Sequence, residues 1–309
     1  MCTYEDLVAA TLPPHGLSPL VVPQLKTITL GGAVTGLGIE SASFRNGLPH
    51  ESVLEMDILT GTGDVVTASR DAHSDLFYAF PNSYGTLGYS VRLKIELEPV
   101  KPFVALRHLR FTSVSDLVAT MDRIVETRGF DGVPVDYVDG VVFSVDEAYL
   151  SLGVRTATPG PVSDYTGRDI YYRSIQHADG EKHDRLTIHD YLWRWDTDWF
   201  WCSRAFGAQN PTIRRFWPPT LRRSSFYWKL IAYDRRFDIA DRIEKRNGRP
   251  PPLERVVQDI EVPIERTTEF VDWFLDNVPI EPIWLCPLRL RDDVGWPLYQ
   301  LPGITPTST

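Results

Sequence analysis

The sequence has little cysteine and no long apolar run, and both absences restrict what the protein can be. Its three cysteines, Cys2, Cys202 and Cys286, are odd in number and widely spaced. This pattern fits neither a disulfide framework nor a Cys-x-x-Cys metal site, and it indicates a reducing compartment. No apolar run approaches the roughly 20 residues that span a bilayer, and the N-terminus has no signal-peptide pattern. We therefore expect a cytoplasmic protein whose contact with a membrane would be peripheral.

The chain also has fewer basic than acidic residues, with 32 lysines and arginines against 41 aspartates and glutamates. The 309 residues carry a formal net charge of −9, and 43% of them are hydrophobic and 12% aromatic. An acidic chain without a basic face is a poor ligand for nucleic acid, so no nucleic-acid partner is expected. The same composition argues against disorder, and the length is enough for two domains of ordinary size.

The most distinctive stretch runs from Pro23 to Gly47, where four glycines fall within eight residues between two apolar runs. Glycines let a backbone come close to another group because they have no side chain. The stretch therefore suggests a cofactor site, although glycines can also serve tight turns alone. The four are Gly31, Gly32, Gly36 and Gly38.

A nicotinamide Rossmann site is the first alternative for this stretch. Gly36 and Gly38 begin a G-x-G-x-x-G pattern, but Ser41 stands where the last glycine belongs. The following segment, Ala42 to Pro49, lacks the apolar periodicity of the helix that this motif requires. We instead expect a strand-turn-strand loop whose backbone amides form a concave site for phosphate oxygens or flavin carbonyls.

The first hundred residues alternate short strands and helices around this loop. A TGTGD turn suits a hairpin, and a second small-residue turn, Asn82 to Gly88, precedes a strand of alternating polarity. The expected elements are a helix over Tyr4 to Thr11 with Thr3 as N-cap, strands over Leu54 to Leu59 and Val65 to Ala68, a helix over Leu76 to Ala79 capped from Asp71 to Asp75, and a strand over Tyr89 to Leu97.

Residues after Pro99 and Pro102 follow the order βαββ, insertion, βαβ, which predicts one antiparallel sheet backed by helices in an α+β fold. We therefore divide the chain into domains 1–100 and 101–309, with an insertion over 156–249. The expected strands are Phe103 to Phe111, Val135 to Ser144, Ala148 to Val154, Val256 to Val262 and Ile283 to Leu290, and the helices are Val114 to Val125 and Phe270 to Leu275.

Within the insertion, residues 191–233 are unusually rich in aromatic residues and arginine, with Trp193, Trp195, Trp199 and Trp201 near its start. One interpretation is a core-covering insertion in which arginines stack on buried rings. The other is a peripheral membrane contact, because Trp and Arg together suit a surface that lies among lipid headgroups and receives an apolar substrate.

The two small-residue loops and the segment between them together carry a family resemblance. The sequence from TLGGAVTGLGIES through TGTGDVVT and DLFYA to YGTLGYS resembles FAD-linked oxidoreductases of the vanillyl-alcohol-oxidase type, which have a PCMH-type FAD-binding domain. Further on, RVVQDIEVPIERTTEFVDWFLDNVPIEPIWLCPLRL resembles the Δ24-sterol reductases and their actinobacterial relatives. The resemblance covers nearly the whole chain.

This resemblance implies that residues 1–100 form the second subdomain of the FAD-binding domain and that residues 101–309 form a substrate-binding cap domain. It also implies that the first subdomain and a C-terminal segment are absent, so the chain is expected to be a fragment. The FAD-contacting residues would be Thr29, Gly31, Gly32, Thr35, Gly36, Gly38 and Ile39 in the first loop, and Gly85, Thr86, Gly88, Tyr89 and Ser90 in the second.

The implied activity is hydride transfer through flavin N5 to or from an apolar, sterol-like substrate, with FAD bound non-covalently and NADPH as a reductant. The hydroxyls of Thr29 and Thr35 would donate to phosphate. The position of Gln24 is acidic in relatives, and no residue stands out as the catalytic acid. A flavin-dependent alcohol or polyol oxidase or dehydrogenase is an alternative, as is a non-catalytic chain with little FAD binding.

Three weaker sets of residues complete the candidates. His177, His183 and His189 recur six residues apart, which is not a spacing for a compact metal site, so we expect a solvated loop and no metal. Acidic and aromatic side chains of the second domain could face a substrate or could be ordinary strand positions. They are Asp136, Tyr137, Asp139, Glu281 and Trp284.

Overall fold

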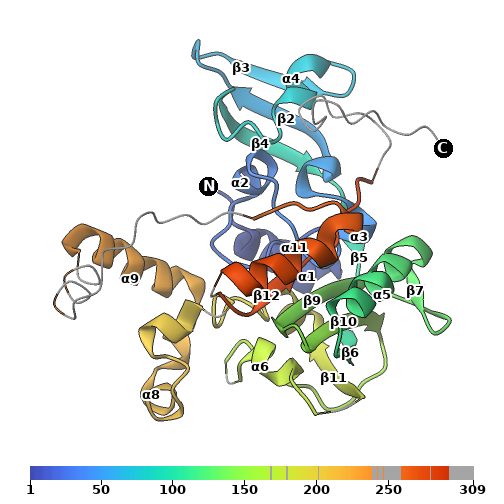
Figure 1. Cartoon of the computed structure of the whole chain (residues 1–309). Helices are drawn as coiled ribbons and strands as arrows, with labels where there is room; N and C mark the ends of the chain where they lie inside the picture. Colours follow the sequence, from blue (N-terminus) through green and yellow to red (C-terminus); the bar gives the residue numbers. More distant parts are fainter. Residues whose placement is uncertain are drawn as a thin grey trace.

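The computed structural model of the chain describes residues 1–167, 169–178, 180–200, 202–238, 242, 246, 259–278 and 280–291. Two antiparallel sheets of different size organise these residues, with helices packed against them (Figure 1). The smaller sheet has three strands and the larger has five. This mixture of helices and antiparallel sheets agrees with the expected α+β class.

Helix α1 (Tyr4–His15) begins at the N-cap that the sequence predicts. The Thr3 hydroxyl accepts a hydrogen bond from the Asp6 amide at 3.1 Å, and the Asp6 carboxylate accepts one from the Thr3 amide at 3.1 Å. This reciprocal capping satisfies donors that the first helical turn leaves unpaired. The helix continues past its expected end to His15, and Gly16 stops it in a left-handed conformation.

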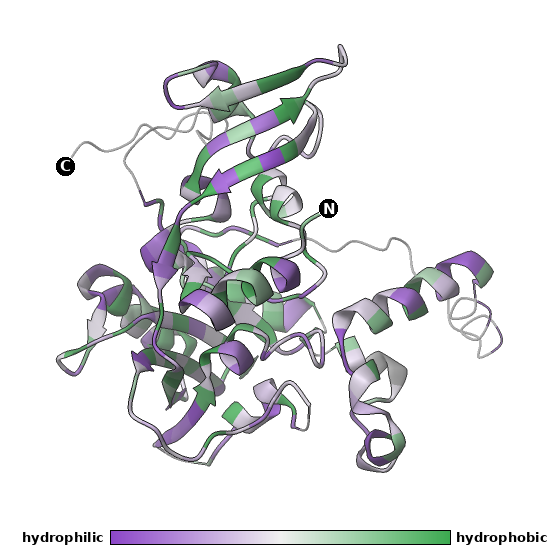
Figure 2. Ribbon diagram, turned by 180° about the vertical axis from the view of Figure 1, so that it is seen from behind, coloured by the Kyte–Doolittle hydropathy of each residue, from purple (hydrophilic) through white to green (hydrophobic). Residues whose placement is uncertain are grey.

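The smaller sheet confirms the predicted hairpin and its neighbouring strand. Its order is β3-β2-β4, with both pairs antiparallel. Apolar and polar residues alternate along these strands (Figure 2), so that one face packs on a small apolar core and the other is polar. The strands are β2 (Val53–Leu59), β3 (Val65–Ser69) and β4 (Tyr89–Ile95).

Helix α4 (Ser74–Ala79) closes this small core through Phe77, as expected, and its N-cap lies within the predicted capping segment, Asp71 to Asp75. His73 occupies the N-cap position in a left-handed conformation, with no side-chain hydrogen bond to the helix. The amides of Asp71 and Ala72 instead point to the Ser69 hydroxyl. Asp71 and Ala72 thus form a turn at the end of β3, because the Ser69 hydroxyl accepts hydrogen bonds from both of their amides.

The larger sheet confirms the predicted antiparallel sheet of the second half. Its order is β11-β6-β10-β9-β12, and all four pairs are antiparallel. Helices α5 (Val114–Thr127) and α11 (Ile264–Asn277) cover one face and share a core with it. The strands are β6 (Phe103–Phe111), β9 (Tyr137–Ser144), β10 (Glu147–Thr156), β11 (Glu181–Thr187) and β12 (Ile283–Leu285).

Two expectations for this sheet need correction. Edge strand β11 comes from within the insertion, which the sequence pattern did not predict, and it pairs with β6 from Glu181 to Thr187. The strand expected at Val256 to Val262 lies partly outside the described residues, and the described residues 259–262 are not in a strand. The predicted last strand shortens to β12, because only three of its residues pair with β9.

Short elements complete the chain. Helices α8 and α9 project away from the two sheets in both views (Figures 1 and 2). These elements are β1 (Leu17–Pro19), α2 (Leu30–Thr35), α3 (Ser43–Asn46), η1 (Pro49–Ser52), β5 (Leu97–Pro99), β7 (Gly129–Phe130), β8 (Val133–Pro134), α6 (Tyr171–Ile175), α7 (Ile188–Leu192), η2 (Cys202–Phe206), α8 (Pro211–Phe216), η3 (Pro219–Leu221) and α9 (Ser224–Phe237).

The largest apolar core joins residues from early and late in the chain. It contains Tyr4, Leu30 and Ala33 together with Trp193 and Trp195 of the insertion. The first helices and the start of the aromatic insertion therefore pack against the same sheet. Among the described residues, no helix has the length and apolar character needed to cross a membrane.

Candidate cofactor-binding site

The first glycine-rich loop contains a short helix, so the expected strand-turn-strand conformation is wrong. The N-cap of helix α2 is Thr29, whose hydroxyl accepts a hydrogen bond from the Gly32 amide at 3.1 Å, and its C-cap is Gly36. Leu30, Ala33 and Val34 are buried at helical spacing. Glycines at the intervening positions lower helix propensity, and they concealed this short apolar pattern in the sequence.

The structure brings the two predicted loops side by side. A Cβ atom placed on Gly31 would lie 2.5 Å from the Ser90 hydroxyl oxygen, so α2 packs directly on β4. The Tyr84 amide in the second loop donates a hydrogen bond to the Thr35 carbonyl at 3.1 Å. Residues about fifty positions apart thus form one continuous surface.

Four of the predicted glycines have close contacts within the protein itself, and a Cβ on Gly32 would lie 2.9 Å from the Thr29 hydroxyl oxygen. Besides Gly31, a Cβ on Gly38 would lie 2.9 Å from Cγ of Pro23. A Cβ on Gly88 would lie 2.3 Å from the Leu59 carbonyl oxygen, and its φ of +130° suits only glycine. Close packing is a sufficient reason for these four glycines, whether or not a cofactor is bound.

The second loop is open at Gly85, and a phosphate-bearing cofactor would require such an open backbone. Gly85 has a φ of +80°, and a Cβ there would meet no protein atom within 4 Å. Gly32, Gly36 and Thr86 are exposed beside it. A ligand could therefore approach the backbone of both loops without displacing a side chain.

The two threonine hydroxyls differ in their capacity to donate to a ligand. The Thr35 hydroxyl already donates to the Gly31 carbonyl at 2.9 Å. The Thr29 hydroxyl accepts from Gly32, which leaves its proton available. At the end of the loop, the Gln24 side-chain amide donates to the Ile39 carbonyl at 3.0 Å, so Gln24 and Ile39 hold the loop in place.

The first loop leads directly into a buried cluster of charged side chains. The Arg194 guanidinium donates to Glu40 Oε1 at 2.6 Å and to Asp139 Oδ2 at 3.1 Å. All three side chains are at most 3% exposed. One cation thus stands between two carboxylates, and Ser41 adds a hydrogen bond to Glu40 at 2.8 Å.

This cluster can hold a proton. Burial raises the pKa of Asp139 from 3.8 to about 6, with Arg194 opposing the shift and Glu40 adding to it. Within the described part of the chain, three buried atoms of the cluster lack a hydrogen-bond partner, and two of them are carboxylate oxygens. They are Glu40 Oε2, Asp139 Oδ1 and Arg194 Nε.

Aromatic rings surround these charges. The Arg194 guanidinium lies 4.0 Å from the centre of the Tyr191 ring. The Trp284 indole donates to Asp139 Oδ2 at 3.1 Å, and Trp284 and Phe200, 5.4 Å apart, are both partly exposed. Phe200 also stacks on buried Trp195 at 4.8 Å. An apolar wall therefore lies between the cluster and solvent.

The other candidates of the second domain divide between this cluster and ordinary structure. Asp139 and Trp284 belong to the cluster. Tyr137 and Asp136 instead hold Arg155, through hydrogen bonds to its side chain at 2.8 Å and to its amide at 2.7 Å. Glu281 is exposed, outside the cluster.

Of the three histidines, only His177 lies in a loop as expected, whereas His183 and His189 lie in regular elements. His177 follows α6, His183 lies in β11 and His189 lies in α7. His183 and His189 pair with the neighbouring carboxylates of Glu181 and Asp190. In the part of the chain that the structure describes, no group of three or more His, Cys, Asp and Glu side chains could hold a metal ion.

Sequence reasoning missed Glu40 and Arg194 as members of this site. Their separation of 154 positions means that only tertiary structure pairs them. A signal was present, because Arg194 lies between Trp193 and Trp195, where an unpaired charge would be costly to bury. A charged residue inside an aromatic run predicts a buried partner of opposite charge.

Comparison with known proteins identifies relatives of this chain. The Delta(24)-sterol reductase of Mus musculus is 29% identical over 303 residues, which are 93% of this chain and 54% of the mouse protein. The Delta(24)-sterol reductase of Arabidopsis thaliana is 27% identical over 307 residues. Cytokinin dehydrogenase 7 of Oryza sativa subsp. japonica is 36% identical over 160 residues, 52% of this chain and 28% of the rice protein. No protein-family model matches the chain.

These matches confirm the suspected relationship. The chain is homologous to Delta(24)-sterol reductases along most of its length and to cytokinin dehydrogenases over about half of it. Both groups are oxidoreductases by name, so the chain is related to enzymes. It spans about half the length of the sterol reductases that it matches.

Proposed function

We propose that this chain is the FAD-holding and substrate-facing portion of a flavin-dependent oxidoreductase that acts on an apolar, sterol-like molecule. The observation that carries this proposal is the contact between the two loops, at Gly31 with Ser90 and at Tyr84 with Thr35. The homology to Delta(24)-sterol reductases over 93% of the chain supports a sterol-like substrate.

The proposed cofactor contacts follow from the geometry of the loops. FAD would lie along exposed Gly32 and Gly36 and the open backbone at Gly85, and the Thr29 hydroxyl would donate to a phosphate oxygen. The bound flavin would supply hydride transfer through its N5 atom, with reduced nicotinamide such as NADPH as electron source. We propose non-covalent binding.

The chain's own residues would orient the substrate and keep water away from it. Phe200 and Trp284 are partly exposed and offer aromatic faces that suit an apolar ring system, and buried Trp195 supports Phe200 from behind. Behind them, Asp139 is a carboxyl group that can keep its proton close to neutral pH, because burial raises its pKa to about 6. Arg194 would hold Asp139 and Glu40 in place.

Titration of the purified full chain with FAD tests the cofactor proposal. We expect a visible flavin absorption band that remains with the protein after gel filtration, and a melting temperature that rises with FAD concentration. A chain that stays colourless and whose melting temperature FAD does not change would overturn the proposal. It would favour the alternative of a chain with little FAD binding.

A matched pair of glycine substitutions localises the binding. Gly85 and Gly132 both have φ near +80°, and a Cβ placed on either would meet no protein atom within 4 Å, but Gly132 lies in the β7–β8 hairpin of the second half. Asparagine tolerates this conformation better than other side chains. We expect Gly85→Asn to weaken FAD binding at least about tenfold and Gly132→Asn to leave it unchanged.

The substrate class requires a separate measurement on flavin-loaded protein. We expect oxidation of the reduced flavin by an alkene of the sterol side-chain type, and no flavin reduction by alditols. Flavin reduction by an alditol or another simple alcohol would favour the alternative, a flavin-dependent alcohol or polyol oxidase or dehydrogenase.

A further inference from the structure

The arm formed by α8, η3 and α9, residues 211–237, has a surface that the proposed oxidoreductase chemistry does not use. Both ribbon views show its two helices extending away from the sheets (Figures 1 and 2). Its exposed apolar side chains are large, and Phe216 and Trp228 are 78% and 50% exposed. The others are Ile213, Tyr233 and Phe237.

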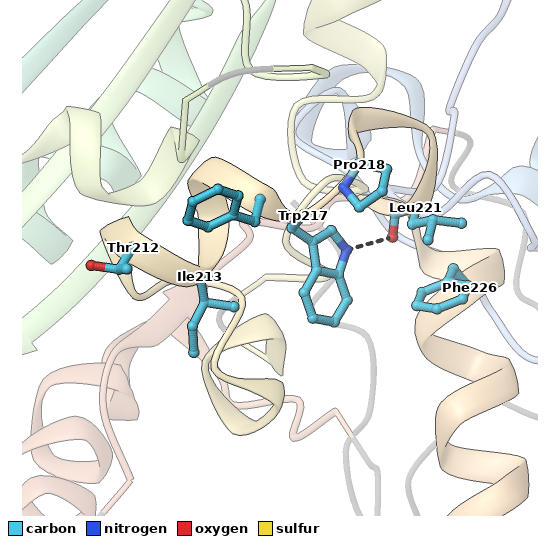
Figure 3. A pocket seen from close by; sticks show the side chains of 7 residues that line it. Thr212, Ile213, Trp217, Pro218, Leu221 and Phe226 are labelled. Carbon is cyan, nitrogen blue, oxygen red and sulfur yellow. Dashed lines mark hydrogen bonds between the residues drawn. The ribbon is translucent and has the colours of Figure 1, made fainter.

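An apolar groove of about 430 Å³ opens between α8 and α9 (Figure 3). The Trp217 indole N–H is already bonded to the Leu221 carbonyl at 3.3 Å, so it is not available to a ligand. Thr212 is the only other lining residue with a polar side chain. The lining residues are Thr212, Ile213, Phe216, Trp217, Pro218, Leu221 and Phe226.

The arm is also basic, in contrast to the rest of the chain. It contains seven arginines and lysines and one acidic residue, Asp234, whereas the whole chain has a net charge of −9. Two of the cations lie against its exposed rings, Arg235 at 5.5 Å from Trp228 and Arg236 at 5.8 Å from Phe237. The exposed cations are Arg215, Lys229, Arg235 and Arg236.

The base of the arm is firmly attached to the rest of the protein. The Tyr227 hydroxyl, on a buried side chain, donates to the Thr197 carbonyl at 2.7 Å. Arg223 pairs with Glu5 of α1 at 2.6 Å, and Arg214 pairs with Asp198 at 2.9 Å. The exposed groove and rings are therefore presented by an anchored element.

We propose that the 211–237 arm docks the protein onto an anionic lipid bilayer. Exposed tryptophan and phenylalanine suit the headgroup boundary, and neighbouring cations are attracted to anionic headgroups. The groove suits an acyl chain better than a nucleic-acid base or an acidic peptide, because Thr212 is the one lining side chain with a hydrogen-bonding group not already paired in the groove. This surface acts independently of whether the loops hold FAD.

The structure also relocates the contact expected at residues 191–233. Trp193 and Trp195 are 1% exposed and cannot reach a headgroup layer, and Trp201 lies outside the described residues. The docking surface is thus the arm and not the start of the aromatic segment.

Flotation of the full chain with vesicles tests the proposal. We compare vesicles of phosphatidylcholine alone with vesicles containing about 30% phosphatidylglycerol, at low and high salt. The chain is expected to float with the anionic vesicles and much less with the neutral ones, and high salt should weaken binding. A chain that floats with neither kind of vesicle would overturn the proposal.

Matched variants test whether vesicle binding depends on the arm or on exposed aromatic and basic residues anywhere on the surface. We expect Phe216→Ser with Trp228→Ser to lower binding at least about tenfold, and Trp273→Ser, on the equally exposed Trp273 of α11, to leave it unchanged. Arg215→Gln with Arg235→Gln should lower binding about thirtyfold, and Arg123→Gln on α5 much less.

Two further outcomes would contradict lipid docking. Arm variants that float like the parent, with unchanged circular dichroism, would show that another surface binds vesicles. A dimer by light scattering that Phe216→Ser dissociates, combined with no flotation, would identify the arm as a contact between two copies of the chain.

Discussion

Arg194 and Arg235 come from the same aromatic-rich insertion, and each guanidinium lies against a tryptophan or tyrosine ring. Arg194 is buried between Glu40 and Asp139, whereas Arg235 is exposed at the end of the arm. Residue type is therefore the same in both places, and the difference lies in the partners. A guanidinium can be buried where carboxylates from distant segments meet it, and otherwise it stays in water.

The same contrast applies to the aromatic rings. Trp195 packs against Tyr171, Phe200 and Trp284 around the buried cluster. Phe216 at the end of α8 is 78% exposed on the rim of a groove. The core-covering interpretation thus holds for Trp193 and Trp195, whereas the arm presents an unburied surface, for which membrane contact stays a proposal.

Removal of the buried cation should give the largest effect. Arg194→Met leaves Glu40 and Asp139 buried without a counter-charge, so we expect a loss of about 3–5 kcal/mol in the free energy of unfolding, measured in urea. Arg215→Met, on the exposed arm, should change it by less than about 0.5 kcal/mol.

A triple variant tests whether the stability loss of Arg194→Met comes from the two uncompensated carboxylates. Arg194→Met combined with Glu40→Gln and Asp139→Asn removes all three charges and should recover much of the lost stability. If the triple variant is no more stable than Arg194→Met alone, the loss reflects packing of the guanidinium and not the uncompensated carboxylates.

Truncation of an aromatic ring should lower the free energy of unfolding much more at the buried cluster than on the arm. Trp195→Ala leaves a cavity in the core and is expected to cost about 3–5 kcal/mol. Phe216→Ala should cost less than about 0.5 kcal/mol, because its side chain is mostly in water. Equal losses in denaturant unfolding would mean that the arm is part of the cooperative core.

The pH dependence of Asp139→Asn tests the buried carboxyl. Since the folded pKa of Asp139, about 6, exceeds 3.8, the folded state holds the proton more tightly. Its contribution to stability is greatest below pH 4 and is lost as pH rises through 6. The variant, which lacks this group, should therefore gain about 2 kcal/mol relative to the parent between pH 4 and 7.

Differences between parent and variant isolate this effect from other titrating groups. Burial lowers the pKa of His50 and of His108 to about 3, so both proteins lose stability as pH falls below 6.5. That loss cancels in the difference of their urea midpoints at each pH. A difference that stays constant from pH 4 to 7 would contradict the raised pKa of Asp139.

The smallest expected effect concerns the contact between the two loops. Gly31→Ala would place its Cβ 2.5 Å from the Ser90 hydroxyl oxygen and should cost about 1–2 kcal/mol. Adding Ser90→Ala removes that oxygen. Because alanine favours a helix over glycine by about 1 kcal/mol, the double variant should be at least as stable as the parent in thermal unfolding. Additive effects of the two changes would mean that the loops are not in contact.

Elements with a strong local pattern could be predicted from the sequence. Thr3 caps α1 as expected, and the alternating strands form the predicted hairpin and sheet. Capping and side-chain periodicity depend on neighbours within four residues, which the sequence displays directly. The relationship to Delta(24)-sterol reductases was likewise readable from the chain alone.

Which aromatic and charged residues are buried depends on contacts that form only in the folded chain. Glu40, Asp139 and Arg194 come from three distant segments, and β11 joins the sheet from within the insertion. A charged side chain can be buried only where the folded chain brings a partner of opposite charge to it. The spacing of neighbouring residues in the sequence does not indicate that partner. Trp195 and Phe216 therefore look alike in the sequence, although one lies in the core and the other in solvent.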